Sequence, residues 1–104
     1  MIETFWLLLV AHAFTDVVGQ TERMELNKHR KNGKVWFYWL LAHGLINGFG
    51  VYAVTQDVML GIGETSLHML TDYLKCEKII TLEVDQFIHL LSKLLWASLC
   101  QNIT

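Results

Sequence analysis

The chain contains no proline among its 104 residues and only two cysteines, Cys76 and Cys100. Because proline is the residue that most strongly interrupts a helix, its absence favours helices that run with few breaks. Two cysteines without metal-type pair spacing exclude a disulfide framework and a thiolate metal site. We therefore expect a helical protein whose cysteines are free thiols.

Charged side chains are also scarce. They make up 17% of the chain, against about 25% in an average soluble domain. Apolar types make up 53%, and the mean hydropathy is +0.34. The net charge of −2 provides no global attraction to nucleic acid, so we expect no specific nucleic-acid partner. A chain of this length forms one domain with a modest core of three or four helices.

Four apolar segments divide the chain, and each predicts a helix. A polar stretch at 21–34, which holds five of the eight basic residues, predicts a loop between the first two helices. Glu3 stands where a signal peptide would carry basic residues, so we expect the first segment to be retained. The expected helices cover residues 2–20, 35–56, 64–75 and 84–100. They predict an all-α fold, a bundle of about four helices.

Within these helices the polar residues form narrow stripes, and the remaining positions are apolar. A soluble bundle turns an apolar stripe inward and a polar face outward, and here the pattern is inverted. If all four segments cross a membrane, seven of the eight Lys and Arg residues lie on one side, which the positive-inside rule assigns to the cytoplasm. We expect a bundle with a polar His/Asp interior, embedded in the inner (cytoplasmic) membrane and in contact with lipid. A soluble homo-oligomer is the alternative.

A five-residue motif appears twice, each time in apolar sequence. His12-Ala13-Phe14-Thr15-Asp16 returns as His68-Met69-Leu70-Thr71-Asp72. Residues four apart lie on one face of a helix, so each copy presents an imidazole beside a carboxylate. The other two helices carry pairs at the same spacing, namely His43 with Asn47 and Asp85 with His89.

Side chains from facing helices build metal sites in four-helix bundles. Imidazole and carboxylate together suit Zn²⁺, Mn²⁺ or Fe²⁺, and we expect one or two such divalent ions. His43 is expected to be a further ligand or a general acid/base. Lys93 either holds an anionic group of the substrate or is a snorkelling lysine near the surface. The expected metal ligands are His12, Asp16, His68, Asp72, Asp85 and His89.

Two adjacent ions would polarise a phosphoryl or carbonyl oxygen, which is the chemistry of two-metal hydrolases. We therefore predict a metal-dependent hydrolase acting on a phosphoester or another small anionic substrate. Two alternatives use the same residues. One is a non-enzymatic membrane protein that binds or transports metal or protons. The other is a phage or host interaction protein in which the His/Asp network is structural.

The polar residues also follow a longer pattern. Its blocks are L-x-x-H-x-x-x-D-x-x-x-Q (Leu9, His12, Asp16, Gln20), T-x-x-M-x-x-x-K (Thr21, Met24, Lys28), a middle histidine (His43), H-x-x-x-D-Y-x-K (His68, Asp72, Tyr73, Lys75) and D-Q-x-x-H (Asp85, Gln86, His89). This pattern resembles a bacterial and phage family of small hydrophobic helical proteins, domain of unknown function 3307. That family usually has glycine where this chain has Thr15, a difference that affects packing more than ligation. The resemblance implies no particular activity, and the pattern is similar in style to the membrane-bound metal-dependent hydrolases of bacteria.

Overall fold

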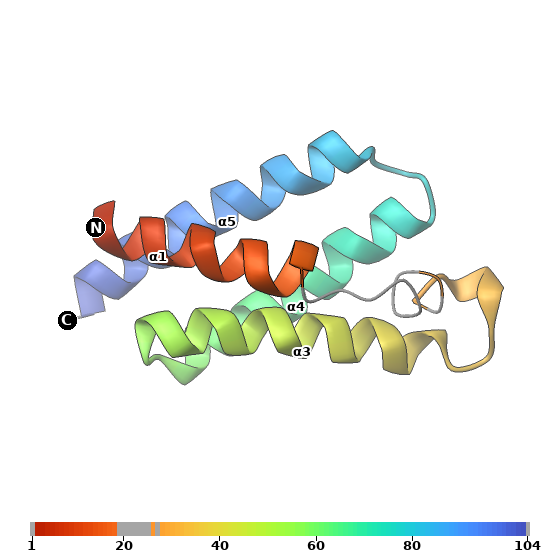
Figure 1. The fold of residues 1–104 in the computed structure, drawn as a ribbon, viewed down its shortest axis with the longest axis horizontal. Coiled ribbons are helices and arrows are strands. Elements are labelled where there is room, and N and C mark those ends of the chain that lie inside the picture. Colours follow the sequence, from red (N-terminus) through yellow and green to blue (C-terminus); the bar gives the residue numbers. More distant parts are fainter. Residues whose placement is uncertain (1, 19–25, 27, 104) are drawn as a thin grey trace.

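The computed structural model describes residues 2–18, 26 and 28–103, and every regular element in this part of the chain is helical. The predicted all-α fold is therefore confirmed. Figure 1 shows four long helices joined by short connections. The elements are α1 (Ile2–His12), the π-helix η1 (Ala13–Val18), the 3₁₀ turn η2 (Arg30–Asn32), α3 (Trp36–Thr55), α4 (Val58–Cys76) and α5 (Leu82–Ile103).

Consecutive helices run in opposite directions and form a four-helix bundle (Figure 1). Helices α1 and α4 each pack against both α3 and α5. The start of α1, the end of α5 and the α3–α4 turn lie at one end of the bundle, and η2 and the α4–α5 turn lie at the other (Figure 1). With principal extents of 42 × 23 × 20 Å, the bundle is elongated along its helices.

Helix α4 begins at Val58, six residues before the start expected from the sequence. The reason is the Asp57 side chain, which accepts hydrogen bonds from the backbone nitrogens of Met59 at 2.9 Å and Leu60 at 3.3 Å. An aspartate in this position satisfies donors that the first helical turn leaves free. Gln56, with a φ of 58°, turns the chain sharply from α3 into this cap. The expected connection at 57–63 is therefore mostly helix.

The other boundaries differ less from expectation. Helix α5 starts at Leu82, where the Thr81 hydroxyl accepts a hydrogen bond from the backbone nitrogen of Val84 at 3.2 Å. The first expected helix changes at Ala13 from α to π geometry, which the sequence pattern did not indicate. The last two residues of that expected helix, and 21–25 and 27 of the expected basic loop, lie outside the described residues.

The interior of the bundle is mainly polar. Among the described residues, fourteen polar or charged side chains are buried, against seven apolar ones. The apolar cluster is small and consists of Leu8, Val51, Leu60, Trp96 and Ala97. Large apolar side chains lie outside instead, such as Phe14 at 66%, Phe49 at 67% and Met59 at 71% exposure. The expected inversion, with polar stripes turned inward, is confirmed.

Candidate metal centre

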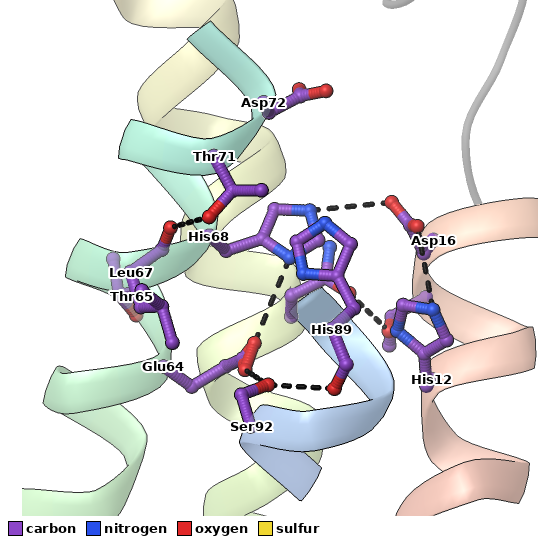
Figure 2. A network of polar contacts seen from close by, with 12 residues as sticks. His12, Asp16, Glu64, Thr65, Leu67, His68, Thr71, Asp72, His89 and Ser92 are labelled. Carbon is purple, nitrogen blue, oxygen red and sulfur yellow. Dashed lines mark hydrogen bonds and ion pairs between the residues drawn. The ribbon is translucent and has the colours of Figure 1, made fainter. Parts of the chain in front are cut away.

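Four histidines, one from each long helix, meet inside the bundle. His12 is 6% exposed, and His43, His68 and His89 are fully buried. The rings of His68 and His89 stack with their centroids 4.1 Å apart, and His43 meets His68 edge-on at 4.9 Å. Figure 2 shows His68 and His89 reaching toward each other from α4 and α5, with Asp16 facing them from the end of the first helix. The convergence expected from the sequence is present.

Asp16 links three of these imidazoles. Its Oδ1 lies 2.8 Å from Nε2 of His43 and 3.2 Å from Nε2 of His68, while its Oδ2 lies 3.5 Å from Nε2 of His12. Asp16 belongs to the π-helix η1, and π turns inside helices are frequent at functional sites. The wider turn changes the direction of the carboxylate from the one it would have in a continuous α-helix. Asp16 consequently contacts His43 of α3 and His68 of α4 as well as His12, four residues before it.

Gln86 joins two carboxylates. Its Nε2 donates to Oδ2 of Asp16 at 3.0 Å and to Oδ2 of Asp85 at 3.2 Å. Its Oε1 lies 3.1 Å from Nε2 of His12, an arrangement in which the imidazole donates and fixes which way the amide points. Gln86 thus orients two possible ligands. His12 contacts the cluster through Gln86 and through Oδ2 of Asp16.

Three sets of donors could hold a metal ion, and any two sets share one residue. In each set the three donor atoms lie within 4.8 Å of one another and all three residues are buried. Since they share members, the sets form one continuous centre. We name them the His43 triad (Asp16, His43, His68), the Glu64 triad (Glu64, His68, His89) and the Asp85 triad (Asp16, Asp85, His89).

Several donor atoms in this centre have no hydrogen bond. Neither ring nitrogen of His68 or His89 has a hydrogen-bond partner, and Nδ1 of His12 and of His43 also lacks one. His89 Nε2 lies 3.2 Å from Oδ1 of Asp85, but without the alignment of a hydrogen bond. An unsatisfied buried polar group costs about 1–3 kcal/mol, so such atoms need an explanation. A bound cation would supply the missing partner, and the donor set therefore fits a metal ion.

Asp72, which the sequence indicated as a ligand, lies beside the centre and is held by lysines. Its Oδ2 is 2.8 Å from Nζ of the buried Lys28, and its Oδ1 is 3.1 Å from Nζ of Lys75. The separation between its Oδ2 and Nε2 of His43 is 4.0 Å. In Figure 2 Asp72 stands about one turn along α4 from His68, away from the imidazoles. The repeated motif is thus used unequally: Asp16 enters the triads from the first copy, and His68 enters from the second.

Glu64 is a possible ligand that the sequence did not single out, although it lies four residues before His68. Both of its carboxylate oxygens accept from Nζ of Lys93, at 2.8 and 2.9 Å. Trp96 Nε1 donates to the same carboxylate at 3.2 Å. Lys93 is 2% exposed, so the alternative of a snorkelling lysine near the surface is wrong. Of the six expected ligands, Asp16, His68, Asp85 and His89 belong to the triads.

Basic residues gather beyond the centre, at the end of the bundle that holds η2 and the α4–α5 turn. Arg30 donates from Nε to Oε1 of Glu77 at 2.5 Å and joins η2 to the end of α4. This hydrogen bond holds the pKa of the partly buried Glu77 carboxyl below its ordinary value. Lys31, Lys34 and Lys78 flank the pair in the sequence. The centre therefore lies inside the bundle, and the end of the bundle beyond it, at η2 and the α4–α5 turn, is rich in cationic side chains.

The function of this chain has to be inferred from this cluster and from the surface around it. The resemblance to the family of small hydrophobic helical proteins stays a prediction. Comparison of the chain with protein-family models, with curated proteins and with solved structures finds no match in any of the three.

Proposed function

We propose that the chain is a membrane-embedded metalloprotein whose His/carboxylate centre binds a divalent transition metal and serves the hydrolysis of a small anionic substrate, a phosphoester above all. His89 is the observation that carries this proposal. Its ring is fully buried, neither nitrogen has a hydrogen-bond partner, and one nitrogen lies with carboxylate oxygens of Asp16 and Asp85 within 4.8 Å. Buried polar atoms are rarely left without partners, and metal ligation is the simplest use for these.

The chemistry of the donors points to the class of ion. Imidazole nitrogen and carboxylate oxygen together suit Zn²⁺, Mn²⁺ and Fe²⁺ better than the soft metals that thiolates select. Asp16 and Asp85 are drawn close together by one amide, that of Gln86. Two carboxylates sharing a buried site repel each other, and a cation between them removes that repulsion.

The apolar outer surface supports placement in a membrane. By length and composition, α3 is the one described helix that could cross a bilayer, with a mean hydropathy of 1.2 over its best window. That measure averages both faces of a helix, and the inward faces of α4 and α5 are polar. The outward face of α5 is apolar. Phe87, Leu91 and Leu95 on this face are 60%, 50% and 49% exposed. Its 22 residues extend about 33 Å, which matches the hydrocarbon core of a bilayer.

The distribution of charge supports an orientation. The basic residues of this end lie in η2, its flanks, the end of α4 or the α4–α5 turn; they are Arg30, Lys31, Lys34, Lys75 and Lys78. The opposite end, with Glu3 and Asp57, has no Lys or Arg among the described residues. Under the positive-inside rule the basic end faces the cytoplasm of a bacterial inner membrane.

A bound divalent ion supplies a Lewis acid for a phosphoryl or carbonyl oxygen. The residues of the chain would then divide the remaining work. Asp16, Asp85 and His89 bind the ion, and Gln86 holds the two carboxylates in place. His43, with Nδ1 free of hydrogen bonds, is the candidate general acid/base. Two lysines contact Asp72, the buried Lys28 and the partly exposed Lys75. Their positive charge favours an anionic substrate that approaches from the basic end.

A second function, metal or proton handling without turnover, is favoured by the enclosure of the centre. Its donors are at most 8% exposed. The gap beside His12, Thr15 and Lys93 is too narrow for a water molecule. A groove of about 270 Å³ between α3 and α4 is lined by other residues, Leu45 and Phe49 among them. Neither space gives a phosphoester access to the donors.

Metal analysis followed by a phosphoester panel separates the two functions. The protein is purified in detergent without chelator, its metals are measured, and Asp85→Asn is compared with Asp57→Asn. Asp57 caps α4 far from the centre, and asparagine caps equally well. A hydrolase loses both metal and turnover in Asp85→Asn and keeps both in Asp57→Asn. Bound metal without turnover on any ester favours metal handling. Wild-type protein that carries no transition metal would refute both the hydrolase and metal handling, and would leave proton handling by the same residues.

A further inference from the structure

Four carboxylates are buried in the part of the chain that the structure describes, and two of them have lysine partners. Glu64 receives both of its short contacts from the ammonium group of Lys93, at 2.8 and 2.9 Å. Asp72 lies between Lys28 and Lys75, at 2.8 and 3.1 Å. Each of these carboxylates is therefore neutralised by the chain itself.

The other two buried carboxylates, Asp16 and Asp85, lack such a partner. Within residues 2–18, 26 and 28–103, no Lys or Arg nitrogen lies within ion-pair distance of either one. Their neighbours are imidazoles and the amide of Gln86. Asp16 and Asp85 thus have only imidazoles and an amide beside them in a place where the side chains are almost fully buried, and charge in such a place requires compensation. One divalent cation neutralises both.

Building on the proposed metal function, we infer that the centre holds a single divalent ion at the Asp85 triad, and that Lys93 takes the place of a second cation in the Glu64 triad. The Glu64 triad has the donors of a second site apart from this lysine, and it shares His89 with the Asp85 triad. A second ion there would be held by Glu64, His68 and the other ring nitrogen of His89, whose N–H proton would pass to solvent. Glu64, His68 and His89 are fully buried, and their donor atoms lie within 4.8 Å of one another. Both histidines have ring nitrogens without hydrogen bonds, so the triad offers free donors as well as charge.

Two features keep the Lys93 ammonium group in the Glu64 triad. This group contacts both oxygens of Glu64 and neutralises the carboxylate, so the charge that would attract a second ion is already compensated. Trp96 Nε1 and Ser92 Oγ also approach Oε1 of Glu64, at 3.2 and 3.4 Å, and hold the carboxylate toward the lysine. A divalent ion entering this triad would meet a like charge a few ångströms away, and repulsion at that range is strong in a medium of low dielectric constant.

The test is the number of ions that each chain binds. Wild-type protein and Lys93→Met are saturated with Zn²⁺ in detergent, freed of excess ion, and analysed for zinc per chain. Methionine keeps an unbranched side chain of similar length and removes the charge. We expect one ion in the wild type and two in Lys93→Met. Lys75→Met is the matched control, because it removes a lysine from Asp72 and leaves Glu64 unchanged; we expect one ion.

A second variant covers the case in which Lys93→Met fails to fold with Glu64 uncompensated. Lys93→Met combined with Glu64→Gln removes both charges, keeps the Asp85 triad, and is expected to bind one ion with wild-type affinity. Two ions in the wild type, one ion in folded Lys93→Met, or none in the double variant would each overturn the inference. A wild type without any ion would instead overturn the proposed function, so the two failures are distinguishable.

Discussion

The amide nitrogen of Gln86 lies 3.0 Å from Oδ2 of Asp16 and joins the first turns of α5 to the π-helix η1. This hydrogen bond connects residues seventy positions apart and fixes the carboxylate that two of the triads share. Groups that orient metal ligands typically change affinity by about 10- to 100-fold when they are removed. We expect Gln86→Ala to weaken zinc binding by about that factor, as measured by competition with a chromogenic chelator. An unchanged zinc affinity in Gln86→Ala would show that Gln86 does not orient the metal ligands.

The two copies of the repeated motif respond differently to the same substitution. Asp16→Ala removes a member of two triads, and we expect it to abolish metal binding. Asp72→Ala leaves all three triads complete and removes the 2.8 Å partner of buried Lys28. We expect Asp72→Ala to retain its metal and to lose on the order of 3 kcal/mol of unfolding free energy. Metal content and denaturant unfolding of both variants decide the matter; loss of metal from folded Asp72→Ala would contradict the assignment.

Gly48 sets the distance between α3 and α4. A Cβ atom at this position would lie 1.9 Å from Oγ1 of Thr65 and 2.6 Å from the backbone oxygen of Gly61. Small residues at such positions allow helix backbones to approach closely. We expect Gly48→Ala to force the helices apart and to lower stability by about 1–3 kcal/mol in a detergent unfolding assay. Gly33→Ala is the control, since nothing lies within 4 Å of its Cβ position, and it should unfold like the wild type.

Metal binding should weaken as the pH falls. Protons compete with a metal ion for imidazole nitrogens, whose ordinary pKa is about 6.5. Affinity is therefore full above this range and is lost as the pH drops through it, and the metal-dependent part of the melting temperature disappears with it. Melting curves from pH 8 to pH 5, with and without zinc, measure the effect. Protein stripped of metal is the control; an equal shift in both series would contradict metal linkage.

The proposed placement and orientation in a membrane can be tested with single cysteines. In a background of Cys76→Ser and Cys100→Ser, Lys31→Cys reports on the basic end and Asp57→Cys on the opposite end. We expect an impermeant maleimide added to whole bacterial cells to label Asp57→Cys, and to label Lys31→Cys only after the membrane is opened. The opposite labelling pattern would reverse the orientation. Recovery of both variants from the aqueous fraction without detergent would favour the soluble homo-oligomer.

The fold was accessible from the sequence because each helix carries one polar pair in an apolar background. Such a pattern has few solutions other than a bundle with its polar stripes inward, and the burial of His43, His68 and His89 follows from it. The start of α4 was missed because Gly61 and Gly63 suggest a connection. In the structure Gly61 lies close to Gly48, at a helix contact where the lack of a side chain is an advantage.

The composition of the centre was less accessible. Two properties of the centre depend on the π geometry at Ala13–Val18, which periodicity does not reveal. His12 lies outside the triads, and Asp16 belongs to two of them. Asp72 and Glu64 pair with lysines because of distances across the bundle. Lys93, for example, is twenty-nine positions from Glu64 in the sequence. Spacing along one helix shows which residues share a face, and it does not show which partners the other helices bring.

The pairing of Lys93 with Glu64 also bears on biosynthesis. Helix α5 follows α4 in the chain, and it supplies the cation for Glu64 as well as Asp85, Gln86 and His89. Until α5 arrives, α4 carries a carboxylate with neither its lysine nor its Trp96 donor. A chain cut short before α5 therefore retains an uncompensated charge within its apolar helices. Glu64 thus acquires its counter-charge and its indole donor only when α5 packs against α4.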